Sequence, residues 1–209
     1  MNIAAFEKLP EERRSAILEA GINEFAACSY PEAGTDRITA AAGISKGLLF
    51  HYFGSKREFY LYCLAIALGR LTAATPQAVQ GDMYGTLFAF MDAKLAQCVR
   101  LPRETAFVNM ASRESSAEIA QGRGEILARY SVITRTQSEK MMNAAFSALT
   151  LKDGDRAVML EALRTYISAL MSKYLVQYQQ QPEVFFQRAE EIKNELRRDI
   201  DLMLYGIAR

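Results

Sequence analysis

The sequence predicts an all-α protein. In almost every stretch between breaks, apolar residues recur at positions i, i+3, i+4 and i+7, the spacing of one helix face, while the alternation typical of strands is hard to find. Ala, Leu, Glu, Gln, Met and Arg dominate the long windows, and Gly and Pro gather between them. We therefore expect three short helices followed by longer ones, with the chain dividing between residues 55 and 75.

The first predicted helix runs from Pro10 to about Cys28. Proline suits a first turn because its missing N–H needs no partner there, and Glu11 and Glu12 put negative charge at the positive end of the helix dipole. A turn-forming cluster after Cys28 ends the helix. The buried face is predicted to consist of Ile17, Leu18, Ile22 and Phe25.

Two short helices and a connector follow. We predict Thr35 as the N-cap of the second helix, which ends at Gly43, a residue that adopts a positive φ without a Cβ clash. Ser45 is the expected N-cap of the third helix, at residues 46–53. Residues 55–58, Ser-Lys-Arg-Glu, form a capping box that opens the fourth helix.

Beyond residue 75 the predicted helices are longer. Glycine or proline bounds each of them, and we place them at residues 83–99, 103–114, 124–149, 155–180 and 183–207. Gly122-Arg123-Gly124 is interpreted as a helix break, because no strand precedes it and a phosphate-binding loop needs a third glycine.

The composition excludes several classes of protein. With 50% hydrophobic and 23% charged residues, the chain is typical of soluble globular proteins. Its three cysteines are widely spaced, unlike zinc or redox pairs, and no signal peptide or membrane span is found, so we predict a cytoplasmic protein that does not bind membranes. One histidine and no catalytic motif predict no metal, no cofactor, no catalytic residue and no enzymatic activity.

The functional signal lies at residues 35–53, which read TDRITAAAGISKGLLFHYF. Two short helices flank the tight turn at residues 43–45, as in a helix-turn-helix. All charged residues from position 37 to position 57 are positive, although the whole chain carries only +1. Such a local excess is expected of a surface that binds phosphates. These cations are Arg37, Lys46, Lys56 and Arg57.

The segment AAAGISKGLLFHYFGSK resembles the DNA-binding domain of the TetR/AcrR family of bacterial transcriptional regulators, and the likeness runs from about Arg14 to Leu64. The resemblance implies a three-helix DNA-binding domain at residues 1–55, a connector helix at 55–73 and a C-terminal helical domain at 74–209 for effector binding and dimerisation. It also implies a homodimer that binds double-stranded DNA.

The resemblance, with the chemistry of the side chains, assigns the DNA contacts. Gly47 lets the helix backbone approach the groove, while Leu48 and Phe50 face base edges. Because many family members have hydroxyl residues at these last two positions, we predict apolar contacts to thymine methyl groups here. The competing interpretation of the lysines and of the histidine is a solvated helix face. The predicted DNA-contacting residues are Thr35, Arg37, Ser45, Lys46, Gly47, Leu48, Phe50, His51, Tyr52 and Lys56.

The C-terminal residues suggest a mostly apolar effector. Methionine adapts its shape and tyrosine adds a hydroxyl, so a bundle lined by them suits such a ligand, although core packing is the competing interpretation for each residue. The predicted pocket residues are Phe88, Met91, Phe107, Met110, Tyr130, Met142, Tyr166 and Met171.

The last two predicted helices carry apolar residues on wider arcs than one core needs, which indicates a homodimer with an inverted-repeat operator. We expect a repressor that a small-molecule effector releases from DNA. The alternatives are an activator of the same family, or a dimer whose C-terminal domain binds a protein partner.

Overall fold

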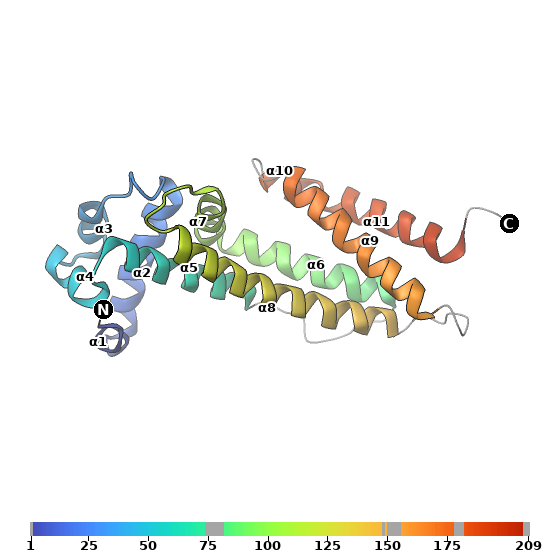
Figure 1. The fold of residues 1–209 in the computed structure, drawn as a ribbon, viewed down its shortest axis with the longest axis horizontal. Helices are drawn as coiled ribbons and strands as arrows, with labels where there is room; N and C mark the ends of the chain where they lie inside the picture. Colours follow the sequence, from blue (N-terminus) through green and yellow to red (C-terminus); the bar gives the residue numbers. More distant parts are fainter. Residues whose placement is uncertain (1, 74–81, 148, 150–155, 178–181, 207–209) are drawn as a thin grey trace. The chain divides into compact units, whose positions relative to one another are not determined.

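The computed structural model describes residues 2–73, 82–147, 149, 156–177 and 182–206 (Figure 1). Every regular element in these ranges is an α-helix, which confirms the predicted all-α class. The chain divides into two compact units, residues 1–74 with 96–136 and residues 75–95 with 137–209. The division differs from the expected boundary at residue 74, because residues 96–136 group with the N-terminal residues. No described helix has both the length and the apolar character needed to cross a lipid bilayer.

Five helices begin the first unit: α1 (Ile3–Glu7), α2 (Glu11–Ala27), α3 (Thr35–Ala42), α4 (Lys46–Phe53) and α5 (Lys56–Thr72). Helix α1 was not predicted from the sequence. This helix is too short to show a periodic pattern, and a buried aromatic contact holds it, with the Phe6 ring lying 4.9 Å from that of Phe53. The Asn2 side chain accepts a hydrogen bond from the Ala5 N–H at 3.3 Å and caps the helix.

Local capping chemistry sets the ends of α3, α4 and α5. Gly43 ends α3 at φ +64°, as predicted. Ser45 Oγ accepts from the Leu48 N–H at 3.2 Å, which confirms Ser45 as a cap. The prediction for Thr35 was wrong: it is the first helical residue, and the N-cap is Gly34, whose N–H donates to the Glu24 carboxylate at 2.7 Å.

The first unit also contains α7 (Pro102–Arg113) and parts of α6 (Met83–Arg100) and α8 (Ala120–Ser147). Two glycines allow close approaches between its helices. A Cβ on Gly21 of α2 would lie 2.6 Å from the Phe59 ring of α5, and a Cβ on Gly122 of α8 would lie 2.5 Å from Leu61 Cδ1 of α5. The predicted break at Gly122 was therefore wrong, because this glycine lies inside α8, where it allows two helices to touch.

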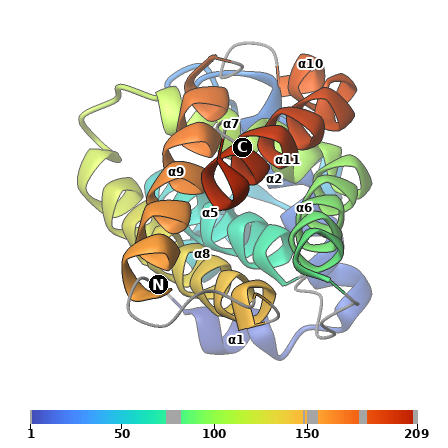
Figure 2. The same cartoon turned by 90° about the vertical axis from the view of Figure 1, so that its right-hand side faces the viewer.

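The remainder of α6 and α8 belongs to the second unit with α9 (Arg156–Gln177), α10 (Pro182–Gln187) and α11 (Ala189–Tyr205). Helices α9 and α11 lie side by side (Figures 1 and 2). At the other face of α11, Lys193 Nζ lies 2.5 Å from Asp92 Oδ1 of α6, and Tyr84 Oη of α6 donates to Asp201 Oδ1 at 2.6 Å. The buried core consists of Met83, Leu87, Met142, Ala145, Phe146, Leu163, Ile167, Leu170, Tyr174, Ile192, Leu196 and Ile200.

Candidate nucleic-acid interface

Helix α4 has one buried face and one open face. Leu49 and Phe53 are fully buried in the core of the first unit. Ser45, Lys46, Gly47 and His51 are exposed, and Leu48 and Phe50 are half-buried. Several of the predicted DNA-contacting residues therefore lie together on the outer face of α4, opposite its buried face.

Gly47 stands in open space. A Cβ built there would meet only Ser45 Oγ, at 3.9 Å, and Gly47 has an ordinary helical φ. Neither packing nor backbone conformation within the protein therefore requires glycine at this position. Glycine in a helix costs stability relative to alanine, and at this position it leaves room for a close approach by something outside the chain.

The cations of this region have partners of different kinds. Lys46 Nζ lies 3.0 Å from an oxygen of Asp36, in the first turn of α3. Lys56 Nζ donates to the Pro31 carbonyl at 3.2 Å and lies 4.7 Å from the centre of the Tyr30 ring. Half of the Lys46 side chain is exposed, and Lys56 is half-buried.

Arg37 is committed to the protein itself. Its guanidinium donates to the Glu24 carboxylate, at 2.8 Å through Nε, and to the Glu32 carbonyl at 2.8 Å. These bonds lower the pKa of Glu24 and raise that of Arg37, because each charge stabilises the other. Arg37 therefore fastens the end of α2 to the start of α3, while 61% of its side chain is exposed and its DNA contact stays a prediction.

Tyr52 and Thr35, two predicted phosphate contacts, are less exposed than Lys46 and His51. Only 7% of Tyr52 is exposed, since its ring packs against Phe6 with 5.7 Å between centres. The Tyr52 carbonyl accepts a hydrogen bond from the Asn2 N–H at 2.7 Å, which ties the end of α4 to the start of α1. Thr35 is half-buried at the start of α3.

Residues in the connection between α7 and α8, which no sequence pattern had indicated, bind Tyr30 and Arg57 close to this surface. Glu118 Oε1 accepts from Tyr30 Oη at 2.6 Å, and the Glu118 carbonyl accepts from Arg57 Nε at 2.9 Å. Glu114 accepts from the Tyr30 N–H at 2.7 Å. Burial and the Glu118 carboxylate raise the pKa of Tyr30. The partners lie 61 to 88 residues apart in the chain, so no local pattern could reveal them.

The predicted pocket residues do not form one lining. Phe107 is buried in the core of the first unit, stacked 5.5 Å from Phe25, and Tyr130 Oη donates to the Ala65 carbonyl of α5 at 2.9 Å. Met110 lies in the same unit. Phe88, Met91, Met142, Tyr166 and Met171 instead belong to the apolar cluster of the second unit. Helical spacing identified inward-facing residues, but it does not say which of two cores they enter.

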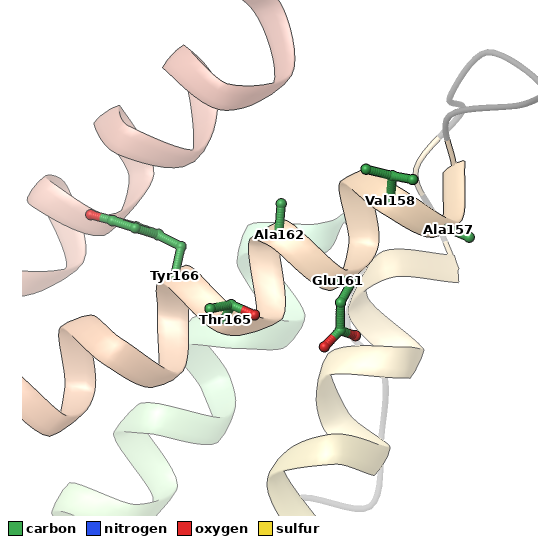
Figure 3. Close-up of a pocket in the computed structure, with 6 residues that line it drawn as sticks. All are labelled: Ala157, Val158, Glu161, Ala162, Thr165 and Tyr166. Carbon is green, nitrogen blue, oxygen red and sulfur yellow. The ribbon is translucent and has the colours of Figure 1, made fainter.

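A pocket of about 720 Å³ lies along α9 (Figure 3). Its lining comes from one helix, so it is an open groove on the surface of that helix. Tyr166 is the one predicted pocket residue in it, and its hydroxyl donates to Asp199 of α11. Val158 is 73% exposed. The lining residues are Ala157, Val158, Glu161, Ala162, Thr165 and Tyr166.

Residues 17–63 match the family described as "Bacterial regulatory proteins, tetR family". A transcriptional activator, FasR of Mycolicibacterium smegmatis, is 38% identical over 74 residues, which are 35% of this chain and 34% of that protein. A transcriptional repressor, AcnR of Corynebacterium glutamicum, is 39% identical over 74 residues, covering 35% and 36%. The chain thus matches about a third of the length of these relatives, both of which are regulators of transcription.

Solved structures share the fold. A tetR-family regulator of Streptomyces coelicolor has a TM-score of 0.62 at 18% identity, covering 93% of this chain and 81% of that one. A tetR-family regulator of Chloroflexus aurantiacus has a TM-score of 0.56 at 22% identity, covering 99% and 98%. The architecture predicted from the sequence, a helix-turn-helix followed by a helical bundle, is therefore confirmed.

Proposed function

We propose that this chain, a member of the tetR family by its residues 17–63, regulates transcription by binding duplex DNA through α3 and α4. The observation that carries the proposal is the open face of α4, where Gly47 has space that the protein does not fill. The fully buried Leu49 and Phe53 fix that face outward. A helix presented in this way enters a major groove with its first residues toward the bases.

Residue roles follow from these positions. Ser45, Lys46, His51 and Lys56 bind phosphates, and the Gly47 backbone lies against the groove. Leu48 and Phe50 are half-buried, so the exposed parts of their side chains contact thymine methyl groups. Thr35 and the edge of Tyr52 are secondary phosphate contacts, whereas Arg37 stabilises the domain.

The second unit supports the proposal of a homodimer. Large apolar side chains are exposed on its last helices, at Val158 of α9 and at Leu202 and Tyr205 of α11. Two copies of α9 and α11 would cover these residues in a four-helix bundle, and a twofold axis would set the two α4 helices about 34 Å apart. The operator is then an inverted repeat.

An effector that prefers the DNA-free state releases the repressor, and operator DNA must weaken effector binding by the same factor. The part-buried Phe88, Met91, Tyr166 and Met171, with the buried Met142, would contact this mostly apolar molecule in the second unit. Phe107, Met110 and Tyr130 are not included, because they belong to the first unit.

Selection of bound sites from random duplex DNA, combined with a salt titration, tests the proposal. We expect an enriched inverted repeat and a logarithmic affinity that falls steeply with salt. The same selection with Phe50→Ala should return a different site, while recovery of the same site would refute direct readout by Phe50. Binding without any enriched sequence would contradict operator recognition.

The sign of regulation is a separate question, since one relative is named an activator and the other a repressor. A reporter driven by the promoter that carries the selected site distinguishes them. Expression that rises when the gene is deleted supports repression, and expression that falls supports the activator alternative.

A further inference from the structure

Asp36 is the one carboxylate within the helix-turn-helix, residues 35–53. It lies in the first turn of α3 with 80% of its side chain exposed, and its two oxygens lie 3.0 and 3.1 Å from Lys46 Nζ. Its neighbour Arg37 is bound to Glu24. Lys46, half of whose side chain is exposed in the first turn of α4, therefore faces a carboxylate on the same surface that would meet DNA phosphates.

Folding does not explain this pair. Water screens an ion pair between two such exposed groups, so it contributes little to stability. Asp36 also gains from the positive end of the α3 dipole, but this gain is small at an exposed position and does not require a lysine beside the carboxylate. On the DNA side the carboxylate has a clear cost, because it repels phosphates and holds the ammonium group that would bind them.

We propose that Asp36 limits the affinity of this protein for DNA. In the free protein its carboxylate neutralises Lys46, and on DNA it competes with a phosphate for the same ammonium group. This inference rests on the proposed function, because it requires α3 and α4 to face the duplex.

Asp36 therefore weakens binding to any DNA to which the protein is held mainly by phosphate contacts. Binding to random sequence depends almost entirely on such contacts, and random sites greatly outnumber operators in a genome. Asp36 therefore reduces the share of the protein held on random DNA.

Asp36→Asn tests the inference because it removes the charge and keeps the size. Fluorescence anisotropy with the full chain and a random duplex of about 30 base pairs gives the Kd over a range of salt concentrations. We expect the affinity to rise about three- to tenfold at low salt and the gain to shrink as salt screens the charges. The salt slope should steepen by up to about 0.9, because Lys46 then neutralises one more phosphate.

Glu191→Gln is the matched control. Glu191 also lies in the first turn of a helix, α11, is exposed, and pairs with Arg188 at 2.6 Å, but it belongs to the second unit. The Glu191→Gln variant changes the net charge by the same amount as Asp36→Asn, and we expect its affinity for the duplex to stay within about twofold of wild type. Asp36→Ser, a second neutral residue suited to a helix start, should reproduce the gain of Asp36→Asn.

Damage to a binding surface lowers affinity, so a gain specific to position 36 distinguishes this role from a structural one. Affinity of Asp36→Asn equal to or below wild type, or an equal gain in Glu191→Gln, overturns the inference while the proposed function stands. Wild-type protein that fails to bind duplex DNA overturns both.

Discussion

Replacing Gly47 with alanine separates what the fold needs from what DNA needs. The new Cβ would meet only Ser45 Oγ at 3.9 Å, so the protein has room for it. Alanine is favoured over glycine in a helix by about 0.5 to 1 kcal/mol, and the gain is toward the lower value in a first turn. We therefore expect Gly47→Ala to stabilise the fold by about 0.5 kcal/mol, a rise in Tm of about 1 to 2 °C.

The same methyl group should weaken DNA binding. If the α4 backbone lies against the duplex at Gly47, the methyl group occupies the contact distance and displaces at least one neighbouring contact. Loss of one good contact, about 1 to 3 kcal/mol, predicts a Kd about five- to 150-fold higher. Urea unfolding measures the first effect and fluorescence anisotropy with duplex DNA measures the second.

Two glycines provide the controls. Gly124 of α8 also has nothing within 4 Å of a built Cβ, so Gly124→Ala should stabilise the fold and leave DNA affinity unchanged. Gly43 has φ +64°, and Gly43→Ala should cost about 1 to 2 kcal/mol.

If Gly47→Ala binds DNA as tightly as wild type, the α4 backbone does not approach DNA there. If it destabilises the fold, the explanation for this glycine is wrong.

Three further changes test the packing, the cations and the electrostatics. Gly122→Ala would place a Cβ 2.5 Å from Leu61 Cδ1, so the buried Leu61 side chain must shift; we expect a net cost of about 1 kcal/mol in urea unfolding, and a higher midpoint would show that Leu61 moves aside freely. Lys56→Ala should lower the salt slope of DNA binding by about 0.9, and a slope equal to wild type would exclude a phosphate contact. Because Arg37 lowers the folded-state pKa of Glu24, this carboxylate stabilises the fold above its unfolded pKa of about 4.3, and the contribution is lost as pH falls through the lower folded value. Glu24→Gln should therefore lower the free energy of unfolding at neutral pH, and this free energy should then fall less steeply below about pH 5 than in wild type. An equally steep fall in the variant and in wild type would contradict the pairing of Glu24 with Arg37.

The helix-turn-helix was predictable because its signals are local. Helix α4 spans residues 46–53 as predicted, since Ser45 caps it and Gly54 ends it within the same few residues. Gly43 likewise ends α3 by its own backbone conformation. At the start of α3, however, the cap prediction failed: the helix begins at Thr35, and the cap position is taken by Gly34, which has no side chain and is held by Glu24 of another helix through its N–H.

The charge pattern was only partly informative. An acid-free run from position 37 to position 57 indicated a phosphate-binding face. The fold brings in carboxylates from outside that run: Asp36 lies on Lys46, and Glu24 binds Arg37. A linear window counts charges along the chain, whereas electrostatic interactions depend on distances in space.

The sequence by itself determined the helical class, the position of the helix-turn-helix and the face of α4 that is buried, because capping and helical periodicity act over only a few residues. Only the tertiary structure decided that α1 packs on α4 and α5 through Phe6, that Gly122 lies inside a helix, and that Tyr30 is held by Glu118. It also assigned Phe107 to the first core and Met142 to the second. These outcomes depend on contacts between residues far apart in the chain, and a helical pattern specifies an inward face without specifying its partner.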